Sequence, residues 1–323
     1  MINLIGMRIL ITGGCGFIGS HVAERNLTEG HDVFILDDLN DFYSPAFKRQ
    51  NLAAAERAGL AGFYHADVRQ AGQVLEIVRE VGPSVVIHLA ARGGVRQSLE
   101  QPLLYEEVNV RGTLALLEAC RAAHVPKFIF ASSSSVYGVG NHLPFREDDP
   151  IRLPISPYAA TKIAGENLCF VYSHLYGIRV VCLRLFTVYG PRQRPDLAIR
   201  KFAELMNCGG EIVIHGEGQT RRDYTYIDDI VDGIVRSLSY DCSYDVFNLG
   251  SSSPISLDTV IETLEQAMGC KAKVRRAPCQ PGDVPITYAD IAKARRILGY
   301  QPCTPFQTGI ENFVQWRRDT CGI

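Results

Sequence analysis

The sequence alternates short apolar strands with amphipathic helices, and this alternation restricts the fold more than any other feature. Strands are predicted in the first half of the chain at Arg8–Thr12, Asp32–Leu36, Gly62–His65, Ser84–Leu89, Lys127–Ser132 and Arg179–Leu185. Helices are predicted between them around Ile18–Glu29, Gly72–Val81, Pro102–Ala122 and Pro157–Tyr176. The segment Val85–Leu89 is apolar on both faces, which is typical of a parallel strand covered by helices on either side. The pattern predicts an α/β fold built on a doubly wound parallel sheet.

The pattern becomes less regular after about Pro191, where glycine, proline and charged residues are more frequent. Further strands are predicted at Glu211–His215 and Val246–Leu249. Three further helices are predicted: one begins at Ile227, one begins at Ser256, and the last lies near Pro305–Arg318. We expect a main domain over residues 1–190 and a smaller C-terminal α/β lobe over residues 191–323. The chain is expected to cross back to the main domain near residues 220–250.

Composition excludes several classes of function. The 323 residues carry 33 Lys and Arg against 35 Asp and Glu, a net charge of −2, which argues against nucleic acid or an anionic membrane as the main partner. No apolar run reaches the roughly 18 residues of a membrane span, and the first residues lack the pattern of a signal peptide. The ten cysteines contain no C-x-x-C pair, which argues against a metal site and favours a reducing compartment. We expect a cytoplasmic protein without a metal.

A glycine-rich turn joins the first strand to the first helix. Gly13, Gly16 and Gly19 stand in this turn, with Phe17 and Ile18 between the last two. Glycines here allow a tight turn and the close approach of a pyrophosphate, which the N-terminus of the helix then attracts. The sequence therefore predicts a dinucleotide site.

Acidic and small residues at the ends of the following strands extend this site. The second strand ends in Asp37 and Asp38, and a carboxylate there accepts a hydrogen bond from a ribose 2′-hydroxyl and repels a 2′-phosphate, which favours NAD over NADP. The third and fourth strands end in the remaining candidates, Asp67, Val68, Leu89, Ala90 and Ala91.

Three residues form a candidate acid–base group. Tyr158 and Lys162 share one face of a helix that Ser156 and Pro157 begin. An ammonium about 4 Å from a phenol lowers the phenol's pKa enough for it to act as a base near neutral pH. Ser133 lies at the end of the fifth strand, where its hydroxyl can share a proton with the substrate oxygen.

These residues together resemble the extended short-chain dehydrogenase/reductase family, specifically its NAD-dependent nucleotide-sugar epimerases and dehydratases. The likeness covers nearly the whole chain and includes Asn109–Thr113, Arg221–Asp229, Phe247–Gly250 and Pro281–Pro285. It implies that Ser133, Tyr158 and Lys162 are catalytic, and that Asn109 is a structural residue on the cofactor side. It also implies that Arg222 binds the substrate diphosphate and that Asp283 lies near the uridine. Residues 1–190 would then bind NAD, and residues 191–323 would mostly bind the nucleotide sugar.

Residues near Ser133 and Thr187 indicate which member the chain resembles. Dehydratases and UDP-glucuronate decarboxylases carry acids next to the catalytic hydroxyl, where this chain has Ser134 and Ser135. UDP-glucose 4-epimerases usually have Asn where this chain has Thr187, and the segments Tyr43–Pro45, Gly94–Arg96 and Arg192–Ala198 closely resemble UDP-glucuronate 4-epimerases. The resemblance implies a substrate site that includes Arg96, Ser134, Ser135, Thr187, Arg192 and Arg194. Arg92–Gly93 departs from this family, which more often has Gln-Ala there.

We therefore expect conversion of UDP-glucuronate to UDP-galacturonate through a 4-keto sugar. A UDP-glucose 4-epimerase is the alternative, as is a lyase (a UDP-uronate decarboxylase or a sugar dehydratase), and a non-catalytic dinucleotide-binding regulator would usually lack the Tyr/Lys pair. The family also implies a homodimer that pairs helices near Pro102–Ala122 and Pro157–Tyr176.

Overall fold

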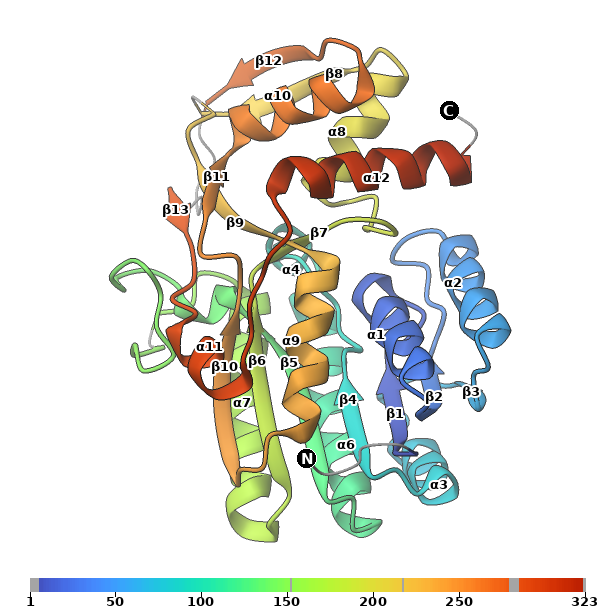
Figure 1. Cartoon of the computed structure of the whole chain (residues 1–323). Coiled ribbons are helices and arrows are strands. Elements are labelled where there is room, and N and C mark those ends of the chain that lie inside the picture. The colour runs from blue at the N-terminus through green and yellow to red at the C-terminus, as the bar shows by residue number, and fades with distance from the viewer. Residues whose placement is uncertain (1–5, 152, 217, 279–284, 322–323) are drawn as a thin grey trace.

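The computed structural model describes residues 6–151, 153–216, 218–278 and 285–321. Its centre is a seven-stranded parallel sheet with the order β10-β6-β5-β4-β1-β2-β3 (Figure 1). The strands are β1 (Arg8–Thr12), β2 (Asp32–Asp37), β3 (Gly62–His65), β4 (Val85–His88), β5 (Lys127–Ser133), β6 (Arg179–Leu185) and β10 (Tyr244–Leu249). All four residues of β4 are buried, as its apolar composition predicts. The doubly wound parallel sheet is thus confirmed.

Helices cover both faces of this sheet (Figure 1). On one face α1 (Phe17–Thr28) packs against α2 (Pro45–Arg57) and α9 (Ile227–Ser239). On the other face α6 (Gly112–Ala122) packs against α3 (Ala71–Val81) and α7 (Pro157–Tyr176). The sequence does not predict α2, because this helix is polar and buries only Lys48, Asn51 and Ala55. A helix without an apolar stripe gives no periodic signal.

The predicted helix Pro102–Ala122 is divided into three segments. It begins as α5 (Pro102–Glu106), passes through a π-helical turn at Glu107–Arg111 and continues as α6; the short α4 (Val95–Glu100) precedes it. A π-helical turn adds one residue to a helical turn and is frequent at functional sites. Here the turn contains Asn109, which is 2 % exposed.

The C-terminal lobe contains two small sheets (Figure 1). One combines β7 (Thr187–Tyr189), β9 (Arg221–Tyr226), β11 (Pro254–Ser256) and β13 (Ile286–Thr287), and the other pairs β8 (Glu211–His215) with β12 (Lys273–Ala277). The remaining helices are α8 (Ala198–Asn207), α10 (Leu257–Met268), α11 (Ala292–Leu298) and α12 (Phe306–Cys321). After β9 the chain returns to the main sheet through α9 and β10. Of the helices described, none combines the length and apolarity that crossing a membrane requires.

Candidate active site

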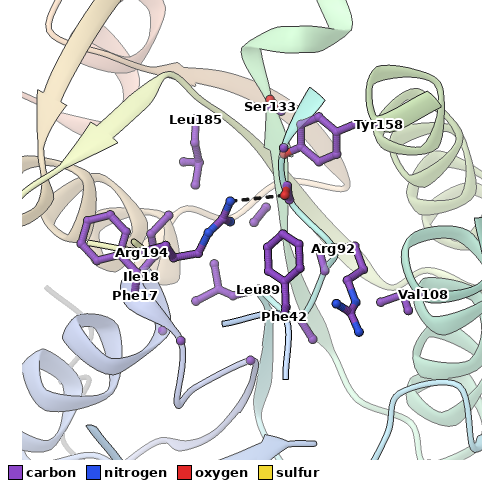
Figure 2. Close-up of a pocket in the computed structure, with 18 of the residues that line it drawn as sticks. Phe17, Ile18, Phe42, Leu89, Arg92, Val108, Ser133, Tyr158, Leu185 and Arg194 are labelled. Carbon is purple, nitrogen blue, oxygen red and sulfur yellow. Dashed lines mark hydrogen bonds between the residues drawn. The ribbon is translucent and has the colours of Figure 1, made fainter. Parts of the chain in front are cut away.

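A cavity of about 430 Å³ opens at the carboxyl edge of the main sheet (Figure 2). It brings together most of the residues that the sequence predicts for a site. These are Gly13, Gly16, Phe17, Ile18, Gly19, Asp37, Asp38, Asp67, Val68, Leu89, Ala90, Ala91, Ser133, Ser134, Ser135, Tyr158, Lys162, Thr187 and Arg194. The cavity therefore spans the predicted dinucleotide turn and the predicted acid–base group.

The glycine-rich turn leaves no space for side chains. Gly13 has φ +72°, and a Cβ added there would lie 2.7 Å from the backbone nitrogen of Ala90. A Cβ on Gly19 would lie 2.2 Å from the carbonyl oxygen of Gly13. Gly16 begins α1 without a side-chain cap, so the first N–H groups of the helix are available to a ligand. This cradle fits the pyrophosphate of a dinucleotide.

Asp37 is held in place at the end of β2. Its carboxylate accepts hydrogen bonds from the backbone N–H of Cys15 at 3.0 Å and of Leu39 at 2.9 Å. Burial raises the pKa of Asp37, and the neighbouring Lys48 ammonium opposes that rise. The carboxylate still lines the cavity, where a ribose hydroxyl can donate to it.

Several cavity residues have no role assigned from the sequence, and Phe42, Tyr43, Lys48 and Arg92 are among them. The first three belong to the segment that follows β2 and begins α2, and long-range folding brings them over the cavity. Lys48 is only 5 % exposed, and burial lowers its pKa. Pro45, which begins α2, is a local signal that a helix starts in this segment.

The predicted acid–base residues meet where β5 ends and α7 begins. The Ser156 hydroxyl caps α7 by accepting from the N–H of Ala159 at 3.1 Å, as predicted. Burial raises the pKa of Tyr158, whereas a hydrogen bond with Ser133 and the charge of Arg194 lower it. Tyr158 and Ser133 lie on the same side of the cavity (Figure 2). This arrangement makes Tyr158 the candidate base.

Lys162 differs in detail from the sequence expectation of a direct ammonium–phenol pair. Its Nζ donates to the carbonyl oxygen of Ala131 at 2.7 Å and lies 6.0 Å from the centroid of the Tyr158 ring. Burial lowers the pKa of Lys162 to about 8. In this structure Lys162 fixes α7 against β5, and Arg194 is the cation that acts on the phenol.

A buried histidine connects the glycine-rich turn to α6. His88 is 2 % exposed; its Nδ1 lies 2.7 Å from Oγ1 of Thr12 and its Nε2 lies 2.9 Å from Oγ1 of Thr113. Thr113 Oγ1 donates to the carbonyl oxygen of Asn109 at 2.6 Å, so it accepts from Nε2–H. Nδ1 therefore accepts from Thr12, which in turn accepts from the N–H of Ala90. Burial lowers the pKa of His88 to about 3, which keeps the ring neutral.

Asn109 continues this chain of hydrogen bonds to the candidate base. Its Nδ2 donates to Thr161 Oγ1 at 3.1 Å, and Thr161 donates to the carbonyl oxygen of Tyr158 at 2.8 Å. Asn109 also binds the backbone of Arg92, accepting from its N–H at 2.8 Å and donating to its carbonyl oxygen at 3.0 Å. Asn109 does not line the cavity but positions two residues that do.

Arg194 reaches the cavity from the loop after β7. Asp196 binds its Nε and Nη2 at 2.9 and 2.7 Å, and Nη2 also donates to the carbonyl oxygen of Gly93 at 3.3 Å (Figure 2). A Cβ on Gly93 would lie 2.6 Å from Nη1 of Arg194. The glycine that departs from the family pattern therefore makes room for this guanidinium.

Three other predicted substrate residues, Arg96, Arg192 and Arg222, do not line the cavity. Arg192 pairs with Glu24 on α1 at 2.9 Å, Arg96 is exposed on α4, and Arg222 is on β9. Asp283 lies outside the described residues. Within the described part of the chain, no group of three His, Cys, Asp or Glu side chains could hold a metal ion.

Comparisons with known proteins extend over almost the whole chain. A model of the NAD dependent epimerase/dehydratase family matches residues 9–250. The chain is 42 % identical to a UDP-glucuronate 4-epimerase of Thermodesulfobacterium geofontis, over 96 % of each protein. A crystal structure of the UDP-glucuronic acid 4-epimerase from Bacillus cereus, in complex with UDP-glucuronic acid and NAD, has a TM-score of 0.89 at 35 % identity and covers 96 % of this chain and 99 % of that one. A dTDP-glucose 4,6-dehydratase from Streptomyces venezuelae with NAD has a TM-score of 0.90 at 30 % identity, over 98 % of both chains. The chain belongs to the NAD dependent epimerase/dehydratase family.

Proposed function

We propose that this protein is a UDP-glucuronate 4-epimerase that interconverts UDP-glucuronate and UDP-galacturonate and retains NAD through each cycle. One observation carries the choice within the family. The carboxylates among the described residues that line the cavity are Asp37, Asp38 and Asp67, and all three belong to the predicted cofactor end. The two residues that follow Ser133 in the cavity lining, Ser134 and Ser135, carry hydroxyls instead of carboxylates. An elimination needs a further acid or base there, whereas an epimerisation does not.

The residues at the cofactor end of the cavity have the shape and the hydrogen-bonding groups that NAD requires. The turn formed by Gly13, Gly16 and Gly19 would bind the pyrophosphate. The Asp37 carboxylate would accept a hydrogen bond from the adenosine ribose, and Asp67 would lie beside the adenine. The bound NAD⁺ would supply the hydride chemistry at C4 of the sugar, while the residues of the chain hold the substrate and move the proton. In this proposal the C-terminal lobe, with Arg222 and Asp283, binds the diphosphate and the uridine.

The chain's own residues would move the proton. Tyr158 takes it from the 4-hydroxyl of the sugar and returns it to the 4-keto oxygen after the ring has turned, while the Ser133 hydroxyl holds that oxygen. Burial raises the pKa of Tyr158, and Ser133 and Arg194 oppose that rise, so these two residues favour the phenolate that the first step requires.

Arg194 and Thr187 would bind the uronate carboxylate. Asp196 occupies Nε and Nη2 of Arg194, which leaves Nη1 as a donor for the substrate. Because two hydrogen bonds to Asp196 fix the plane of the guanidinium, the carboxylate that it binds is also held in one plane. A substrate without a carboxylate would gain nothing from this group, and this favours UDP-glucuronate over UDP-glucose.

The first test is the cofactor content of the purified protein. We expect NAD to be released when protein that has received no added cofactor is denatured, because the catalytic cycle regenerates NAD in place. The supernatant is assayed for NAD and NADP by enzymatic cycling. Recovery of NADP as the main nucleotide would contradict the role of Asp37.

The second test concerns a homodimer, which we propose forms through the helices α4 to α7. Large apolar side chains are exposed there: Leu99 59 %, Leu103 78 %, Phe170 52 %, Leu175 61 % and Tyr176 50 %. Replacing Leu103 and Leu175 by glutamate should convert the dimer to a monomer, because buried charges oppose association. Light scattering after size exclusion measures the mass. The matched control is Val274→Glu on β12, another exposed apolar residue, which should leave the dimer intact.

The setting proposed for this enzyme is the cytoplasm. Eight described cysteines are free thiols, among them the buried Cys15, Cys120, Cys169 and Cys182. Thiols of this kind are stable in a reducing compartment.

A further inference from the structure

Arg92 lines the cavity with a guanidinium that has no anionic partner among the described residues. The Arg92 side chain stacks on the Phe42 ring, whose centroid lies 5.1 Å from Cζ of Arg92. By contrast, Arg194 pairs with Asp196, and Arg69 pairs with Asp67 and Glu107. Asn109 binds the backbone N–H and carbonyl oxygen of Arg92, and the side chain extends from this backbone along the Phe42 ring (Figure 2).

Lys48 is a second cation of this kind in the same cavity. It is 95 % buried, and over the described residues its ammonium makes no hydrogen bond or ion pair; it lies 5.2 Å from the centroid of the Tyr43 ring. Burial lowers the pKa of Lys48, the charges of Asp37 and Asp38 raise it, and the charge of Arg92 lowers it further. Two cations that repel each other in one cavity are both stabilised when an anion binds between or beside them.

The carboxylates of the cavity are already bound by the protein. Both carboxylate oxygens of Asp67 accept from the Arg69 guanidinium, and Asp37 accepts from two backbone N–H groups. Asp38 accepts from the backbone and side chain of Asn40. The donors of Arg92 and Lys48 are therefore left for a ligand.

The position of Arg92 indicates which anion it binds. The charge of Arg92 acts on the pKa values of Asp67, Lys48 and Tyr105. In Figure 2 the Arg92 side chain lies beside Val108, on the opposite side of Phe42 from Arg194. Asp67 and Lys48 belong to the cofactor end, which also contains the uncapped start of α1. The phosphates of the dinucleotide are the anions bound at that end.

We propose that Arg92, together with Lys48, binds the phosphates of the dinucleotide and slows its release. This proposal rests on the proposed binding of NAD. It gives a role to the arginine that departs from the family pattern, since glutamine at this position would carry no charge.

The test is the affinity of cofactor-stripped protein for NAD⁺, measured by isothermal titration calorimetry at 50 and 300 mM KCl. Arg92→Gln should weaken binding by about tenfold to a hundredfold at low salt, the range of a charge-assisted hydrogen bond, and should reduce the loss of affinity on adding salt. Arg92→Lys should keep most of the salt dependence. The matched control is Arg57→Gln, which removes the same charge from the exposed end of α2.

Two outcomes would overturn this proposal, and a third would overturn the proposed function. If the wild-type protein binds NAD⁺ and Arg92→Gln binds within twofold of it with the same salt dependence, the phosphate contact is wrong and the cofactor site stands. If Arg92→Lys weakens binding as much as Arg92→Gln at both salt concentrations, stacking rather than charge is responsible, and the proposal is again overturned. If the wild-type protein binds no NAD⁺, the proposed function itself fails.

Discussion

Replacing Tyr158 by phenylalanine should lower the rate of epimerisation by about 10²- to 10⁴-fold, the usual contribution of a general acid–base group. Only the phenolic oxygen is removed, so the fold and the bound NAD should be retained. The rate is followed by NMR of the UDP-sugar product, and the cofactor is quantified after denaturation. Ser133→Ala should be milder, because Tyr158 can still act and Ser134 lies in the same cavity.

Tyr105→Phe is the matched control for this experiment. Tyr105 lies edge-to-face with Tyr158, with ring centroids 6.2 Å apart, but its hydroxyl donates to the carbonyl oxygen of Gly93. It should lose less than tenfold in rate. A Tyr158→Phe protein that retains NAD and a substantial fraction of the wild-type rate would show that another group is the base.

Replacing Arg194 by alanine should reduce turnover of UDP-glucuronate by about tenfold to a hundredfold, far more than any turnover of UDP-glucose. Oxidation at C4 creates a β-keto acid, which loses CO₂ when the bond to its carboxylate aligns with the carbonyl π-system. Without the guanidinium the carboxylate can rotate into that alignment, so part of the intermediate should appear as a UDP-4-keto-pentose. Mass spectrometry gives the ratio of pentose to hexuronate products.

Arg194→Lys separates the two properties of the guanidinium. Lysine keeps the charge but cannot hold a plane, so this variant should retain more affinity than Arg194→Ala and still release CO₂. Equal losses on UDP-glucuronate and UDP-glucose, with no pentose product, would make Arg194 a diphosphate contact and favour the UDP-glucose alternative.

The parts of the site that the sequence predicts are those that local signals determine. The glycines at 13, 16 and 19 need the turn that they form, and Ser156 with Pro157 begins α7 as a cap and first residue should. Strands with apolar residues on both faces can only be buried in a covered sheet, and β4 and β5 are buried throughout.

The parts that it does not predict depend on contacts between distant segments. In the sequence His88 is a residue within an apolar strand, and nothing beside it in the chain indicates a hydrogen-bonding partner. The folded structure places its ring between Thr12 and Thr113. Arg192 and Arg194 are two residues apart, yet their side chains go to different places. Arg192, whose backbone is left-handed with φ +62°, pairs with Glu24 on α1. Arg194 lines the cavity. Sequence spacing alone cannot distinguish these two directions.

The return of the chain to the main sheet has a consequence for how the protein can be made. Because β10 pairs with β6 along its whole length, residues 244–249 supply one edge strand of the main sheet, and they are synthesised only after the first segments of the second lobe. While only the first 190 residues of the nascent chain have left the ribosome, β6 is an unpaired, hydrophobic edge strand. The two lobes are therefore not separable pieces for expression, and a chain shortened before Leu249 would aggregate through that edge rather than fold as a free-standing nucleotide-binding unit.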